Sequence, residues 1–295
     1  MNSTSSKHKI LKDFYETRIW KFHYGMELYE RIRLQNLFEI LTPKPTDIFL
    51  DAGCGGCIYT KQIADISTVV AADISRRGLK IAKEELTGFS AHIHFVVCDN
   101  ESLPLSDESV DKIVTIDTLE HMRDVKAFFE EAKRLLKPKG KISIFTACGK
   151  NKFTLEHILK PFPVLGRLIE AVRSKFGHIN IFTTQYLRDL VEPDFEIMRI
   201  RYMHHWFGWL FKFLWDIRNI DSTKDCSKLP KFKNEISATF SQVIWQALKI
   251  EYKIFKKFGS GSEIMLHATK KSDSNVHDFE DFEYHTKQLS QLLAS

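Results

Sequence analysis

Four carboxylates stand at the ends of apolar runs, and their spacing indicates a site for a polar ligand. Asp51 precedes a glycine-rich turn at 53–56, and glycine lets a backbone bend sharply and approach a ligand closely. Asp73 follows Gly53 by twenty residues, a spacing that puts a carboxylate at the tip of the neighbouring strand, within reach of a ribose. One strand-end acid is usually a turn or cap residue. Four on successive strand ends, with Asp99 and Asp117 as the others, are better explained by a nucleoside-bearing cofactor.

The apolar runs that carry these acids predict a mostly parallel sheet. They end at Leu50, Ala72, Val97, Ile116 and Phe145. The segments between them are long enough for helices, and such alternation favours helices on both faces of the sheet. Ligands bind at the carboxyl ends of the strands in open sheets of this kind. Two further strands are predicted at 195–202 and 263–269.

The details of the turn decide which cofactor is expected. A dinucleotide fingerprint would need glycine at position 58, where the chain has Ile58, and the Gly-Lys-Ser/Thr of a P-loop is missing. The segment instead resembles motif I of the class I S-adenosylmethionine-dependent methyltransferases, Asp-x-Gly-x-Gly-x-Gly. Asp51, Gly53 and Gly55 occupy its first three fixed positions, and Cys57 replaces the third glycine.

The resemblance continues downstream, in order, over roughly residues 46 to 201. Asp73-Ile74 is similar to motif II, and 96–105 resembles the segment whose acid caps the adenine amino group. Residues 111–121 resemble the fourth strand and "L-E-H" turn of quinone-type methyltransferases. Residues 135–145 resemble the following helix end and fifth strand, and 176–183 is similar to a "G-H-x-x-x-F-T" segment.

The resemblance implies a Rossmann-like methyltransferase fold: a doubly wound, mostly parallel seven-stranded α/β sheet that binds S-adenosyl-L-methionine. In that family Asp73 would hold the ribose and Asp99 the adenine, while the glycine turn would shape the pocket for the methionine portion. The cofactor-binding residues expected are Asp51, Gly53, Gly55, Asp73, Ile74, Asp99, Asn100 and Asp117. No metal is expected.

The turn after the fourth predicted strand bears on the acceptor. Methyltransferases that modify amino groups of DNA bases or glutamine carry a sequence similar to Asn/Asp-Pro-Pro-Tyr/Phe at this position. This chain has Asp117-Thr-Leu-Glu120-His121 instead. That difference favours an oxygen or carbon of a hydrophobic small molecule, such as a quinone precursor, a lipid or a phenolic natural product. His121 is the expected catalytic base, since imidazole titrates near neutrality. A structural role for His121 is equally open. His178 and the adjacent His204 and His205 are weaker candidates.

Helices are expected on both sides of this core. Apolar residues at helical spacing predict a helix over 10–41 that ends before Pro43. It could form a lid with Tyr15, Trp20, His23 and Tyr24 over the substrate, or simply pack on the core. The expected divisions are 1–45 for this lid, 46–201 for the cofactor-binding core, 202–261 for a hydrophobic helical insertion between strands six and seven, 262–270 for the last strand and 271–295 for a tail.

The insertion combines aromatic residues with lysines. Residues 204–217 are apolar nearly all round, and apolar residues recur at helical spacing between 236 and 258, beside Lys249, Lys253, Lys256 and Lys257. Three interpretations are open: a cap over a hydrophobic substrate, with or without contact to a membrane surface through 204–258, plain packing of two helices, or a homodimer interface.

Composition narrows the remaining classes. The chain has 295 residues, 43% of them hydrophobic, and a formal charge of +5. That mild charge does not favour nucleic acid as a partner. The five cysteines are irregularly spaced and predict no disulfide framework. No secretory leader is recognised at the start of the sequence, so a cytoplasmic protein is expected, and peripheral membrane association is left open. The alternatives are a tRNA or protein methyltransferase and a non-catalytic methyltransferase-like scaffold.

Overall fold

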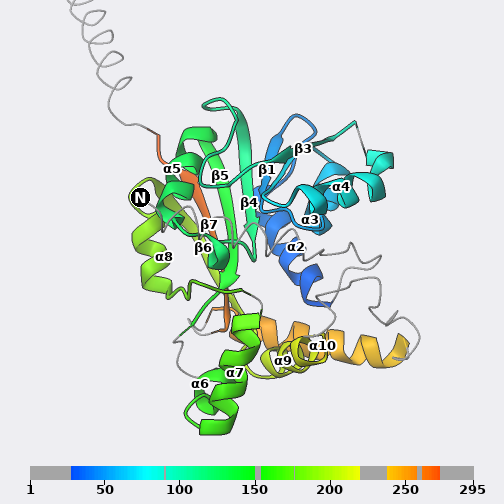
Figure 1. The fold of residues 1–295 in the computed structure, drawn as a ribbon, viewed down its shortest axis with the longest axis vertical. Helices are drawn as coiled ribbons and strands as arrows, with labels where there is room; N and C mark the ends of the chain where they lie inside the picture. The colour runs from blue at the N-terminus through cyan, green and yellow to red at the C-terminus, as the bar shows by residue number, and fades with distance from the viewer. Residues whose placement is uncertain are drawn as a thin grey trace, which may run out of the picture.

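A seven-stranded sheet forms the centre of the molecule in the computed structural model (Figure 1). The structure describes residues 28–89, 91–149, 154–175, 177–219, 238–257 and 261–272. The spatial order is β3-β2-β1-β4-β5-β7-β6, and β7 alone runs antiparallel to its neighbours. The strands are β1 (Ile48–Ala52), β2 (Thr68–Asp73), β3 (Ile93–Val97), β4 (Val110–Ile116), β5 (Leu136–Ala147), β6 (Phe195–Met203) and β7 (Glu263–Lys270). This arrangement confirms the predicted fold class.

Helices cover both faces of the sheet (Figure 1). Buried residues of α5 (Val125–Leu135) and α8 (Thr184–Val191) belong to one hydrophobic cluster. Buried residues of α2 (Leu28–Leu41), α3 (Ile58–Ala64), α4 (Arg76–Glu85) and α10 (Ala238–Phe255) belong to the other. On β4, Ile113 joins the first cluster and its neighbour Val114 the second, because successive strand side chains point to opposite faces. Burial on both faces explains why these strands read as continuous apolar runs.

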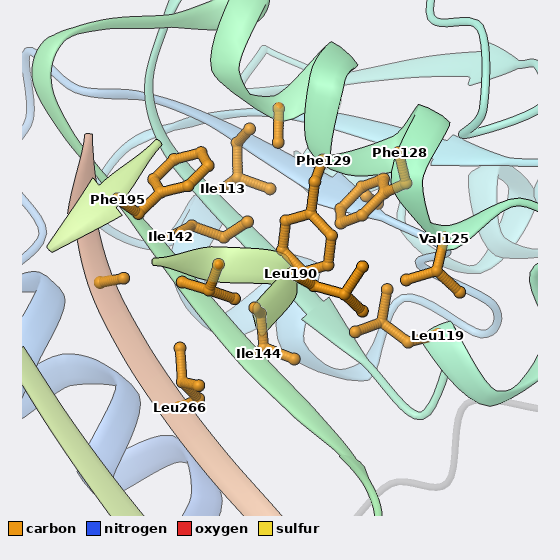
Figure 2. Packing of buried hydrophobic residues seen from close by; sticks show 14 of the residues in the cluster. Ile113, Leu119, Val125, Phe128, Phe129, Ile142, Ile144, Leu190, Phe195 and Leu266 are labelled. Atoms are coloured by element: carbon orange, nitrogen blue, oxygen red, sulfur yellow. The ribbon is translucent and has the colours of Figure 1, made fainter. Parts of the chain in front are cut away.

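The core on the α5 face is built around aromatic rings (Figure 2). Phe129 is almost fully buried. Its ring makes edge contacts with Phe128 and Phe195, at centroid distances of 5.5 Å and 6.5 Å. Phe129 therefore joins α5 to the start of β6.

The antiparallel strand determines where the insertion lies. β5 and β6 end, and β7 begins, at the edge of the sheet where β1, β2 and β4 also end. The helices α6 (Leu155–Leu159) and α7 (Pro163–Lys175) follow β5, while α9 (Phe207–Asn219) and α10 lie between β6 and β7. All four gather below that edge in Figure 1. The predicted insertion is thus placed beside the expected ligand site.

Two expectations fall partly outside the described residues. Of the helix predicted over 10–41, the described part is α2. Tyr15, Trp20, His23, Tyr24 and the tail beyond 272 lie outside. Within the described ranges, no helix combines the length and the apolar character needed to cross a membrane.

A buried hydrogen bond supports the turn between β1 and α3. Thr60 Oγ1, on α3, donates to Asp51 Oδ2 over 2.5 Å, and both side chains lie inside the protein. Burial raises the pKa of Asp51 to about 7, against an ordinary value of 3.8. Asp51 therefore stabilises the turn from its buried side, through its hydrogen bond to α3.

Removing the central ring should destabilise the fold. We expect Phe129→Ala to lower the free energy of unfolding by about 3–5 kcal/mol, because it removes buried surface and leaves a cavity. Denaturant titration would measure the loss. Phe162→Ala is the matched control, because Phe162 is 57% exposed, and it should change stability by no more than about 0.5 kcal/mol. Equal losses in the two variants would contradict this view of the core.

The buried Asp51 should make stability depend on pH. Its pKa is higher in the folded chain than in the unfolded one, so its contribution to stability is complete below pH 4 and is lost as pH rises toward 7. Asp51→Asn, which cannot ionise, should lack that part of the decline, up to about 1.4 kcal/mol per pH unit. Chemical unfolding of both proteins between pH 4 and 8 would test this. Parallel stability curves would contradict it.

Candidate active site

Positive φ angles shape the glycine turn after β1. Gly53 has φ +80°, and an added Cβ would lie 2.3 Å from Thr118 Cγ2, so a side chain cannot fit there. At Gly55, with φ +50°, an added Cβ would meet no atom of the described chain within 4 Å, so the described residues leave this side of the turn open. Cys57 adopts φ 59°, and its amide donates to the carbonyl of Cys54 over 2.7 Å. Cysteine thus takes the left-handed conformation that the missing glycine would favour.

Asp73 lies at the tip of β2, directly beside this turn. The amide of Gly55 donates to its Oδ2 over 2.9 Å, and the amide of Ser75 donates to its Oδ1 over 2.8 Å. The two bonds orient the carboxylate. Each carboxylate oxygen can accept more than one hydrogen bond, so Asp73 can also receive hydroxyl donors from a ligand. Ile74 follows it and is half-buried.

The residues after β3 lie in a different polar environment. Asp99 Oδ2 accepts from Arg123 Nη2 over 2.9 Å, and Asp99 Oδ1 accepts from the amide of Glu101 over 3.0 Å. Arg123 was not expected from the sequence. Asn100 is buried, and among the described residues no donor reaches its Oδ1.

The residues at this edge fit an adenosyl cofactor. A buried amide oxygen without a donor is costly, and a ligand donor would satisfy Asn100. The open face at Gly55 leaves room for the ligand beside the oriented carboxylate of Asp73. The hydroxyl and amino groups of a nucleoside can donate hydrogen bonds to the oxygens of Asp73 and Asn100.

An arginine from α2 joins the site. Arg33 Nη1 and Nη2 donate to Oδ2 and Oδ1 of Asp117 over 2.7 Å and 3.1 Å, and Nη2 also contacts Glu263. Burial is the largest single influence on the pKa of Glu263 and raises it, but Arg33, His204 and Lys212 together outweigh burial and lower that pKa. Sequence reasoning missed Arg33. One signal was available, because Arg33 precedes Leu37 and Leu41 by four and eight residues and so lies on the buried stripe of α2.

The "L-E-H" turn forms a short 3₁₀ helix, Leu119–His121, after β4. Glu120 is buried and accepts a 2.8 Å hydrogen bond from Thr146 Oγ1, and burial raises its pKa. His121 Nδ1 donates to the carbonyl of Gly177 over 3.1 Å. Since that carbonyl can only accept, the lone pair of the neutral ring lies on Nε2.

The segment after α7 packs on this turn. The amides of Ile179 and Asn180 both donate to the carbonyl of Glu120. The rings of His121 and His178 are nearly perpendicular, with centroids 5.0 Å apart. Glu120, His121 and His178 each place one side-chain oxygen or nitrogen within 4.8 Å of the other two. These three atoms are close enough to share a proton or to coordinate a small cation. The structure therefore joins two segments that are 57 residues apart in the sequence.

The adjacent histidines diverge, as expected. His204 Nε2 lies 3.1 Å from Glu263 Oε2, whereas the ring of His205 packs against Phe255 at 5.3 Å. Both are buried, and burial lowers the pKa of His205. The two rings therefore have different contact partners, although both histidines line one small cavity beside Glu251.

Comparison with known proteins shows a match to a methyltransferase domain over part of the chain. Residues 50–144 match the family described as Methyltransferase domain. Phosphoethanolamine N-methyltransferase 1 of Arabidopsis thaliana is 34% identical over 117 residues, which are 39% of this chain and 24% of that protein. The ubiquinone biosynthesis O-methyltransferase of Brucella melitensis biotype 2 is 30% identical over 130 residues, 41% of this chain and 52% of that protein. The chain thus spans about half the length, or less, of these curated relatives.

A solved structure shows the same fold. Geranyl diphosphate C-methyltransferase from Streptomyces coelicolor A3(2), in complex with Mg²⁺, geranyl-S-thiolodiphosphate and S-adenosyl-L-homocysteine, superposes with a TM-score of 0.52 at 17% identity, covering 82% of this chain and 76% of the other. The matched residues 50–144 contain the glycine turn, the row of strand-end acids and the "L-E-H" turn. The comparisons therefore support the predicted resemblance to S-adenosylmethionine-dependent methyltransferases over residues 50–144, which match a methyltransferase domain.

Proposed function

We propose that this protein transfers a methyl group from S-adenosylmethionine to an oxygen or carbon of a hydrophobic small molecule, for example a quinone precursor, a lipid or a phenol. The observation that carries the proposal is the edge where the open glycine turn, the oriented Asp73 and the "L-E-H" turn meet the ends of neighbouring strands. The names of the ubiquinone O-methyltransferase and the geranyl diphosphate C-methyltransferase support an acceptor with apolar character.

The proposed cofactor contacts follow from this geometry. Asp73 accepts hydrogen bonds from the ribose hydroxyls while the Gly55 and Ser75 amides hold its orientation. Asn100 receives a donor from the adenine side with its buried Oδ1. Asp99 stays the proposed acceptor for the adenine amino group, with Arg123 holding its carboxylate. Asp117, which accepts two hydrogen bonds from Arg33, faces the methionine portion of the cofactor.

Methyl transfer places modest demands on the protein. S-adenosylmethionine, when bound, supplies a methyl group on a sulfonium, ready for in-line displacement. The protein must hold the acceptor in line and exclude water. An acceptor that arrives as a phenol or alcohol must also lose a proton. We assign that proton to Nε2 of His121, since Nδ1 is committed to Gly177.

Loss of the Asp73 carboxylate should weaken cofactor binding. A charge-assisted hydrogen bond contributes about 1.5–3 kcal/mol, so Asp73→Ala should raise the Kd for S-adenosylhomocysteine by roughly ten- to a hundred-fold. Titration calorimetry would measure it. Glu84→Ala, at an exposed position on α4, is the control and should bind normally. Unchanged affinity in Asp73→Ala would remove Asp73 from the site.

The role of His121 can be separated from its structural hydrogen bond. His121→Asn keeps a side-chain N–H that can reach the Gly177 carbonyl but has no basic nitrogen. With a prenylated phenol and radiolabelled methyl donor, we expect kcat to fall by about a hundred-fold or more while S-adenosylhomocysteine affinity stays unchanged. Turnover equal to wild type would exclude His121 as the base. Detection of no labelled product from phenol, lipid or quinone-precursor acceptors by the wild-type protein would count against the proposed function itself.

A further inference from the structure

Exposed apolar side chains are concentrated on one group of helices. About two thirds of the large hydrophobic residues that the described chain exposes lie on α6, α7, α9 and α10 or on the residues that border them. Single exposed apolar residues are common on any protein surface, but a concentration of them marks an interaction site. We call these four helices the platform.

On α10, two apolar stripes run along one helix. Ile244 and Leu248 are buried and pack in the core cluster shared with α2. Val243, Ile250 and Ile254 are 61%, 57% and 54% exposed, and their spacing of seven and four residues aligns them on a different face of the helix. Packing among the described residues therefore explains the first stripe only.

The same division recurs on α9 and α7. On α9, Phe207, Leu210 and Leu214 are exposed at a spacing of three and four, while Trp209 is buried. On α7, Val164 and Leu168 are exposed, whereas Ile169 and Val172 are buried. Each of the three longer platform helices thus has an apolar stripe that the described residues leave uncovered.

Two buried carboxylates hold the platform together. Trp209 Nε1 on α9 donates to Glu156 Oε2 on α6 over 3.2 Å. Glu251 on α10 accepts from the amides of His205, Trp206 and Gly208 at the start of α9. These bonds join α9 to α6 and to α10, and an ion pair between Lys160 and Glu170 joins the end of α6 to α7. The stripes consequently belong to a connected set of helices and not to independent loops.

The charge of the platform is complementary to an anionic surface. The segments 155–175, 207–219 and 238–257 contain ten Lys and Arg but only four Asp and Glu, although the whole chain carries a formal charge of only +5. Two of these four acids, Glu156 and Glu251, are the buried ones that link the helices. Lys253 lies at the flank of the exposed stripe of α10, where its ammonium group can reach past the apolar side chains.

We propose that the platform lies on the surface of an anionic lipid bilayer, with its exposed stripes in the boundary between headgroups and acyl chains and its lysines against lipid phosphates. A second copy of the chain fits the same stripes less well, because a symmetric contact would oppose two basic faces. This inference goes beyond the proposed function. It places the carboxyl edge of the sheet, and so the candidate active site, toward the membrane.

Vesicle flotation of the full chain tests the proposal. We expect binding to vesicles of phosphatidylcholine with about one third phosphatidylglycerol, and at least tenfold weaker binding to pure phosphatidylcholine. Ile250→Ser with Ile254→Ser, and separately Lys253→Glu with Lys257→Glu, should each weaken binding to the anionic vesicles at least about tenfold.

Matched variants make the result decisive. Ile66→Ser with Met198→Ser changes exposed apolar residues away from the platform, and Lys80→Glu with Lys126→Glu reverses exposed charges on α4 and α5. Both should bind within twofold of wild type, and circular dichroism would check that every variant is folded. Absence of flotation with either vesicle, or equal losses in platform and control variants, would overturn the proposal.

Light scattering distinguishes membrane binding from dimerisation through the same apolar stripes. A dimer that dissociates in Ile250→Ser with Ile254→Ser, combined with no vesicle binding by wild type, would assign the stripes to a second copy and overturn the lipid proposal. Flotation needs neither methyl donor nor acceptor. Failure of the flotation experiment would leave the Asp73 and His121 predictions intact. Failure of those two predictions would likewise leave the membrane proposal intact.

Discussion

Parallel pairing of β1 with β2 and with β4 is the constraint on which the candidate site depends. Because these strands run in one direction, they end at one edge, and Asp51, Asp73 and Asp117 arrive there from distant parts of the sequence. The register places Asp51 beside Ala71 and Val114, so Asp51 lies one step inside the sheet. Asp73 and Asp117, at the tip of β2 and just after β4, are more accessible. The same residue type therefore has different roles at neighbouring strand ends.

The charged side chains at this edge, most of them buried, are balanced across several elements. Arg33 comes from α2, Asp117 follows β4, Glu263 begins β7 and His204 follows β6. A lone guanidinium inside a protein would be strongly destabilising, whereas one paired with two carboxylates is tolerated. The network consequently connects α2 to the ends of β4 and β6 and to the start of β7. It also couples the insertion, through His204, to the residues around the candidate cofactor site.

Departures from a motif need not alter the geometry that the motif describes. Cys57 adopts a positive φ in place of the expected glycine, and the turn keeps its open face at Gly55. Non-glycine residues at such angles are uncommon and cost conformational energy. Here the buried bond between Asp51 and Thr60 and the turn bond between Cys57 and Cys54 hold the backbone on either side. The cofactor turn is therefore preserved by its surroundings.

The sequence by itself determined the seven strands, their mostly parallel arrangement, the glycine turn and the row of strand-end acids, because strand periodicity and glycine conformation are local properties. It also placed the insertion helices. It did not reveal that Arg33 clamps Asp117, that Arg123 holds Asp99, or that the segment after α7 packs on the "L-E-H" turn. Nor could it show that α7, α9 and α10 each leave an apolar stripe exposed. Those facts were decided only by the tertiary structure, because partners of charged and apolar side chains come from elements far apart in the chain and depend on how the helices pack against the sheet.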